Sequence, residues 1–82
     1  MDLHKGSVVY YARLIPKNHI YEVCELKIRT VEDTWFVGVD KRDKHAYLLN
    51  ITDVNQTVFE KRQDTLALAK VAQKKDEKEY EN

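Results

Sequence analysis

The side chains best suited to catalysis or metal binding are scattered along this chain. The histidines His4, His19 and His45 fall at the N-terminus, in an expected loop and at the edge of an expected turn. A nucleophile needs a base within hydrogen-bond reach and a group that orients that base. Zinc needs cysteine and histidine ligands at a recognisable spacing. Neither pattern occurs, so we expect no enzyme, no catalytic residues, no metal site and no cofactor.

The single cysteine, Cys24, shares its strand parity with Leu26 and Ile28. This predicts a buried, small apolar residue, which is the usual state of a free cysteine. One cysteine forms no internal disulfide, which favours a cytoplasmic protein. The first six residues lack the apolar centre of a signal peptide, and no apolar run approaches the roughly 20 residues of a membrane span. We expect a cytoplasmic protein without a membrane segment.

Cationic side chains gather in one turn, next to a histidine, and recur on two expected strands. The turn residues are Lys41, Arg42, Lys44 and His45, and the strand residues are Arg13, Lys27 and Arg29. If these groups converge, they form a surface for phosphate or for an acidic partner. The alternative is a solvated turn, because Asp40 and Asp43 interleave with its cations.

Among the aromatic residues, Tyr11 and Trp35 are the candidates for a binding surface. Each carries a polar tip that is compatible with a partly wet boundary, so each suits either the core or the surface. Phe36 and Phe59 have no such tip, and we expect both in the core.

Up to residue 59 the chain alternates short β-branched and aromatic runs with polar turns. This pattern predicts strands at residues 7–15, 20–31, 34–39, 45–49 and 57–59. In the second strand the apolar parity changes between Val23 and Glu25, which indicates a bulge or a sharp bend. Gly38, within the third strand, marks another bend or a close backbone approach. Bent strands of this kind predict a small, mainly β, antiparallel barrel of five strands.

A single C-terminal helix is expected at about residues 61–75, where the domain formed by residues 1–75 ends and a charged, flexible tail, 76–82, begins. Leu68, Val71 and Ala72 form an apolar stripe at helical spacing. Leu66 and Ala69 widen the apolar arc beyond what one docking face requires. We therefore expect a second contact through Leu66 and Ala69, in a homodimer or with a host partner, which would help a domain too small for a large core.

Four segments carry a resemblance: KGSVVY at 5–10, TWFVGVD at 34–40, AYLL at 46–49 and VFEKR at 58–62. With the order of elements, they resemble small uncharacterised SH3-like barrel proteins of phages, prophages and mobile elements of Gram-positive bacteria. Those proteins often have a Glu-Ala pair in the first helical turn, where this chain has Asp64 and Thr65. The resemblance implies a five-stranded SH3-like barrel with a C-terminal helix, in a non-enzymatic protein of the bacterial host cytoplasm. It transfers no site residues.

Two functions from different classes remain. The leading one is a protein-interaction or adaptor module that binds through Tyr11, Trp35 and the turn at residues 41–45. The alternative is a small nucleic-acid-binding barrel that stacks bases on aromatic rings beside cations. With 14 basic and 14 acidic residues the formal net charge is zero, which disfavours the alternative because nucleic-acid binders usually show a basic excess or stripe.

Overall fold

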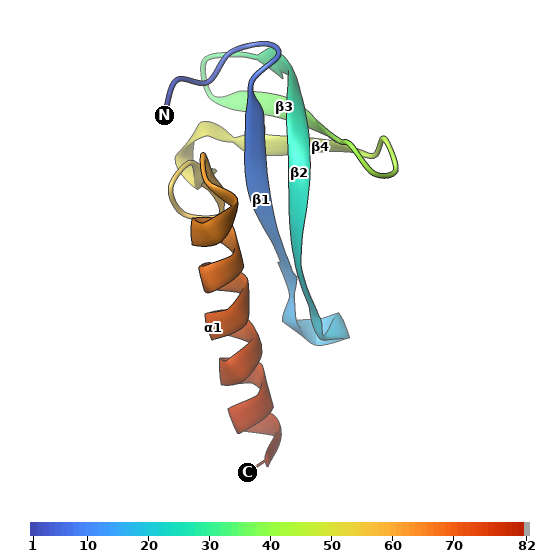
Figure 1. The fold of residues 1–82 in the computed structure, drawn as a ribbon, viewed down its shortest axis with the longest axis vertical. Helices are drawn as coiled ribbons and strands as arrows, with labels where there is room; N and C mark the ends of the chain where they lie inside the picture. Colours follow the sequence, from blue (N-terminus) through green and yellow to red (C-terminus); the bar gives the residue numbers. More distant parts are fainter. Residues whose placement is uncertain (82) are drawn as a thin grey trace.

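The computed structural model describes residues 1–81, and it places five strands before one long helix (Figure 1). The strands are β1 (Val8–Ile15), β2 (Ile20–Val31), β3 (Trp35–Asp40), β4 (Ala46–Asn50) and β5 (Val58–Phe59). Two short 3-10 turns, η1 (Pro16–Asn18) and η2 (Ile51–Asp53), connect strands, and the helix is α1 (Arg62–Glu81). The expected five strands and C-terminal helix are confirmed.

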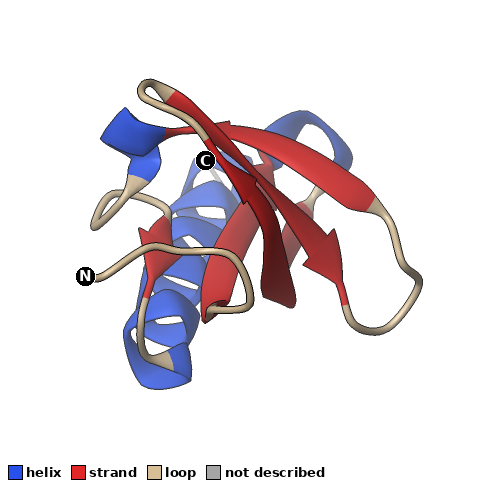
Figure 2. Ribbon diagram, turned by 90° about the horizontal axis from the view of Figure 1, so that it is seen from above, coloured by secondary structure: helices blue, strands red, loops and turns tan. Residues whose placement is uncertain are grey.

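The strands form one antiparallel sheet in the order β4-β3-β2-β1-β5. The sheet is open: β4 and β5 are its two edges, so the expected closed barrel is not reached. It is nevertheless strongly curled, as the view from above shows (Figure 2). The ring of Tyr11 in β1 lies 5.4 Å from the ring of Tyr47 in β4, although β2 and β3 lie between them in the sheet. Only a curled sheet brings these two rings together.

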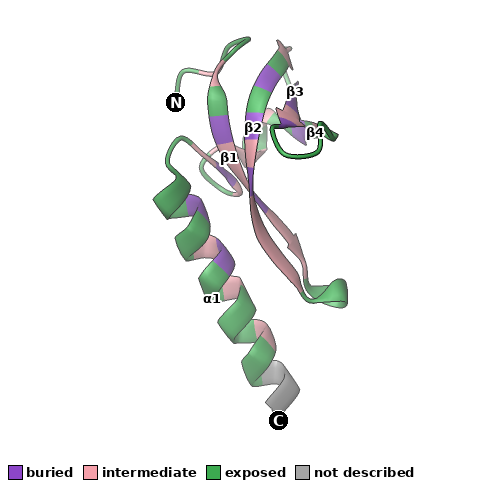
Figure 3. Ribbon diagram, turned by 45° about the vertical axis from the view of Figure 1, so that its right-hand side comes forward, coloured by how far each residue is buried: buried purple, intermediate pink, exposed green. Residues whose placement is uncertain are grey.

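The sheet has an inner face, which carries the main buried cluster, and an outer face, on which the helix packs. Cross-strand partners point to the same side, and side chains alternate between sides along a strand. The inner face carries Val9, Leu26 and Phe36, which belong to the main buried cluster. The outer face carries Ala12 and Lys27, and its half nearest η1 is covered by α1. Figure 3 shows the buried turns of α1 on the side of the helix that faces β1 and β2.

Of the two interpretations of the parity change between Val23 and Glu25, a bulge or a sharp bend, the bulge is wrong. The pairing of β1 with β2 runs without interruption, and the irregularity of β2 lies between Ile28 and Thr30, opposite β3. The parity change has another cause. Near Val23 the helix covers one face of β2, and from Cys24 onward the core covers the other face. Val23 faces the helix side of the sheet, whereas Cys24 and Leu26 face the inner core.

Four predictions about single positions are tested by burial and by close backbone approach. Cys24 is 2% exposed and Phe36 is fully buried, so both are core residues as expected, whereas Phe59 is half-buried. Gly38 lies against Leu26, because a Cβ at Gly38 would stand 2.9 Å from Leu26 Cδ1. The predicted close approach at Gly38 is therefore confirmed.

The helix packs on the outer face of β1 and β2 through its small residues. Thr65 and Ala69 are buried, and the Thr65 hydroxyl donates to the Tyr10 carbonyl oxygen at 3.4 Å and to the Lys61 carbonyl oxygen at 3.1 Å. Ala69, only 3% exposed, is used in this packing and is not available for a second contact, whereas Leu66 is 40% exposed.

The helix does not end at Lys75 but continues to Glu81, through most of the expected tail; Asn82 lies outside the described residues. Asp76 Oδ2 lies 2.7 Å from His19 Nδ1, next to the β1–β2 connection. Hydrogen bonds from His19 and from Tyr21 lower the pKa of Asp76. This long-range contact ties the C-terminal half of the helix to the sheet. Within residues 1–81, no helix combines the length and the apolar character needed to cross a membrane.

Candidate functional site

The sheet places the two candidate aromatic residues on opposite faces. Tyr11 pairs with Cys24 and points to the inner face, where it is half-buried. Trp35 is the neighbour of buried Phe36 in β3, so its side chain points to the outer face, and it is 38% exposed. The expectation that Tyr11 and Trp35 share one binding surface is therefore wrong.

Three rings gather at one end of the inner face. Besides the contact between Tyr11 and Tyr47, the His45 ring lies 4.6 Å from the Tyr47 ring. Burial is the main cause that raises the pKa of Tyr11, and it also raises the pKa of Tyr47. Both phenols are thus neutral at physiological pH, and the cluster is an extension of the core toward solvent.

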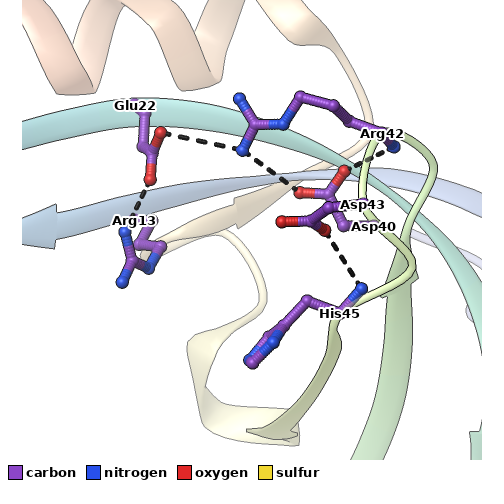
Figure 4. Close-up of polar contacts among 6 residues, drawn as sticks. All are labelled: Arg13, Glu22, Asp40, Arg42, Asp43 and His45. Atoms are coloured by element: carbon purple, nitrogen blue, oxygen red, sulfur yellow. Dashed lines mark hydrogen bonds and ion pairs between the residues drawn. The ribbon is translucent and has the colours of Figure 1, made fainter.

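The cations beside these rings are already paired with carboxylates (Figure 4). Arg13 Nη1 donates to Glu22 Oε1 at 2.6 Å, which raises the pKa of Arg13. Arg42 Nη2 lies 3.9 Å from Glu22 Oε2 and 3.8 Å from Asp40 Oδ2. The Arg42 backbone N–H also donates to Asp40 Oδ1 at 2.8 Å. Arg13 and Arg42 therefore belong to a pairing network that organises this end of the sheet.

Cys24 lies beside this network and is not equipped as a nucleophile. Burial, together with the neighbouring carboxylates of Asp40 and Glu22, raises the pKa of the Cys24 thiol to about 11. The reactive form of cysteine is the thiolate, which this site disfavours. In the described part of the chain, no group of histidine, cysteine and carboxylate side chains is placed to hold a metal ion.

A second set of cations lines a groove of about 730 Å³. We call it the basic groove, and its cationic residues are Lys5, Lys27, Arg29, Lys41 and Lys44. The remaining lining residues are Gly6, Ile28, Val39 and Asp40. Asp40, which is 2% exposed, is the only acidic residue among them. The groove thus presents several positive charges above a partly aliphatic floor.

Among the described residues, most of these cations form no ion pair with a carboxylate. Lys41 Nζ lies 2.7 Å from Glu25 Oε2, and this contact raises the pKa of Lys41. Among residues 1–81, no ion pair is found for the other four cations of the basic groove. Their charges are therefore exposed to solvent, or to a ligand, without internal compensation.

The structure brings together part of the cationic set that the sequence singled out. Lys27, Arg29, Lys41 and Lys44 meet at the basic groove, whereas Arg13, Arg42 and His45 contact the inner-face network and rings. Lys5 was missed. It reaches the groove because the Gly6 backbone N–H donates to the Ile28 carbonyl oxygen at 2.8 Å, and no local sequence signal marks such a long-range bond.

Exposed aliphatic side chains border the basic groove. The cross-strand row Val8–Lys27–Val39–Ala46 runs over the outer face, and Leu48 lies on the same face opposite Val37. Val8 is 42% exposed and Leu48 is 71% exposed. A ligand in this region would therefore meet apolar side chains next to positive charges.

The described residues define a class, a small antiparallel β-sheet domain with one C-terminal helix and a basic groove formed by β2, the end of β3 and the turns before β1 and after β3. No protein-family model matches the chain, and no curated protein or solved structure is significantly similar to it. The functional conclusion therefore depends on the geometry of the two faces.

Proposed function

We propose that this chain is a non-enzymatic protein-binding module whose basic groove receives an acidic, partly apolar segment of a partner. The observation that carries the proposal is the set of cations at the groove that lack a carboxylate partner within the described residues. Such cations repel one another, and an acidic segment would replace that repulsion with attraction.

The chemistry around the groove favours a protein segment over a nucleic acid. Proteins that bind single strands combine cations with aromatic rings on which bases stack. Here the rings of Tyr11, Tyr47 and His45 cluster on the inner face, and the residues that line the groove include no Phe, Tyr or Trp. Trp35 is exposed on the outer face but does not line the groove. The groove borders are aliphatic, which suits Val or Leu side chains beside carboxylates.

We also propose that the curled sheet belongs to the SH3-like type of small barrel. The contact between Tyr11 and Tyr47 across two intervening strands supports this assignment, because it requires a sheet that is close to closing. Origin in a phage or mobile element of a Gram-positive bacterium, and residence in the host cytoplasm, stay predictions.

The test measures binding of a fluorescein-labelled nonapeptide, Glu-Glu-Glu-Val-Thr-Val-Glu-Glu-Glu, by fluorescence anisotropy at low and at high salt. The double variant Lys27→Glu/Arg29→Glu should lower the affinity by about tenfold or more, since each reversal turns an attraction into a repulsion. The matched control is Lys17→Glu/Lys70→Glu, which changes the net charge equally at exposed positions outside the groove.

Two outcomes would overturn the proposal. Equal loss of affinity in the groove variant and in the control variant would mean that net charge alone attracts the peptide. A single-stranded oligonucleotide of the same length that binds more tightly than the peptide, with a strong salt dependence, would favour the nucleic-acid alternative instead.

A further inference from the structure

Strand β4 is a sheet edge whose backbone has free hydrogen-bonding groups. In an antiparallel pair, residues alternate between those that bond to the partner strand and those that point away. The bonds from the Asp40 N–H to the His45 carbonyl oxygen and from the Ile51 N–H to the Thr34 carbonyl oxygen fix this alternation. The backbone groups of Ala46, Leu48 and Asn50 consequently point away from β3.

One of these groups is already used. The Asn50 N–H donates to Asp53 Oδ2 at 3.0 Å, within the capping interaction of η2. The N–H and C=O groups of Ala46 and Leu48 stay at the open edge, next to a Leu48 side chain that is 71% exposed. The edge therefore offers two adjacent attachment points for an extended chain.

The edge also lacks the features that normally prevent pairing with another chain. In natural proteins, charged residues, proline, bulges or a covering element prevent an edge strand from pairing with a further strand. The five residues of β4 include no charged residue and no proline, and the pairing of β4 with β3 is regular. The other edge, β5, has only two residues and leads almost directly into α1.

The charges around β4 favour an acidic segment as the chain that pairs with this edge. Val39, the cross-strand partner of Ala46, and Lys44, just before β4, both line the basic groove. A segment lying along β4 would therefore end beside Lys44, at the rim of the basic groove, and its acidic flank would have to cross β3 to reach the cations of β2. The same edge of a second copy offers no carboxylate to them, because residues 44–50 contain none. An acidic partner segment fits both the edge and the groove.

We infer that the acidic partner segment binds as an added β-strand along β4, hydrogen-bonded to Ala46 and Leu48, with its acidic flank in the basic groove. This inference rests on the proposed function and specifies how the partner is held. Backbone bonds of an added strand supply affinity, and alternate side chains supply specificity. Here a Val or Leu side chain of the partner would lie beside Leu48 on the outer face.

The first test is Leu48→Pro, which removes the backbone N–H that points away from β3 while keeping an apolar side chain. Proline is tolerated on edge strands at such positions. The affinity for the nonapeptide should fall by about tenfold, the value of one hydrogen bond. Leu48→Val is the matched control, since it keeps the N–H and should bind within about threefold of the parent. Circular dichroism and thermal melting verify that both variants fold.

A second measurement leaves the protein unchanged and therefore does not depend on the folding of a variant. N-methylation of the nonapeptide, one residue at a time, removes one backbone donor in each peptide. Strand addition predicts a loss of affinity that alternates with a period of two residues, because only every second donor faces β4. A uniform effect, or none, would overturn strand addition.

The outcomes separate the two proposals. If the groove reversals abolish binding while Leu48→Pro binds like the parent and the methylation series does not alternate, the groove function stands and strand addition is wrong. If the methylation series alternates while the groove reversals have no effect, the edge binds peptide without the proposed acidic selectivity. If the parent chain does not bind the nonapeptide at low salt, both proposals are wrong.

Discussion

The two faces of the sheet use the same kind of side chain in opposite ways. On the inner face, Arg13 and Arg42 lie beside Glu22 and Asp40, and their charges are compensated within the chain. At the basic groove, cations such as Lys27 have no such partner among the described residues. The difference teaches that the cations with a carboxylate partner and the cations without one lie in different parts of the sheet, the first being arginines and the second mostly lysines.

The largest expected effect is on the buried acid of the inner-face network. Asp40→Ala removes an acceptor for the Arg42 backbone N–H and a charge beside its guanidinium. We expect a loss of about 2–3 kcal/mol in the free energy of unfolding, as for buried hydrogen bonds to charged groups. Urea denaturation followed by circular dichroism measures this loss.

The matched control is Asp43→Ala. Asp43 Oδ1 accepts the backbone N–H of His45 at 3.0 Å, two residues along, as Asp40 does for Arg42, but it does so at an exposed position. The control should cost about 1 kcal/mol or less, because water replaces the lost acceptor. Equal losses in the two variants would show that burial of Asp40 adds nothing, and the contrast between the faces would weaken.

A smaller effect compares one cation from each face. Arg13→Ala should lower the free energy of unfolding by a small amount that salt reduces, since its ion pair with Glu22 is partly exposed. Lys27→Ala should change it by no more than about 0.5 kcal/mol, because Lys27 has no ion pair within the described chain to lose. Urea denaturation at low and high salt checks both values. A larger loss for Lys27→Ala than for Arg13→Ala would contradict the division between the faces.

The strands could be predicted closely because their signals are local. β2 begins and ends where the pattern of β-branched residues and turns placed it, and the other strands differ by a residue or so. The parity change at Val23 was misread because a sequence shows which residues are apolar but not what covers them. A helix on one face and a core on the other produce the same pattern as a bulge.

The candidate site could be predicted only in part, for a related reason. Lys27, Arg29, Lys41 and Lys44 were recognised as cations on wet positions, but their convergence depends on the pairing of β2 with β3. Tyr11 and Trp35 were grouped by chemistry, and the strand parity of β1 relative to β3 separates them. Residue type indicates what a surface can bind, whereas register decides which residues form it.

The smallest expected effect concerns a third charged group, Asp76, on the helix-covered half of the outer face. Hydrogen bonds from His19 and Tyr21 lower its pKa below the ordinary value of 3.8. A carboxyl group whose pKa is lowered by folding stabilises the folded state above its unfolded pKa, and this contribution disappears as the pH falls through the folded pKa. Asp76→Asn should therefore reduce stability at neutral pH and flatten its decline below pH 3.8.

Urea denaturation of the parent, of Asp76→Asn and of Asp33→Asn, from neutral pH to below pH 3.8, measures this effect. Asp33 lies exposed in the turn between β2 and β3, so its variant controls for the loss of one negative charge. Parallel pH profiles for the two variants would mean that Asp76 does not hold the helix to the sheet. If stability depends less steeply on pH in Asp76→Asn alone, the paired carboxylate of Asp76 stabilises the half of the outer face that the helix covers. The other half carries cations that have no such pairing within the described chain and that we propose bind a partner.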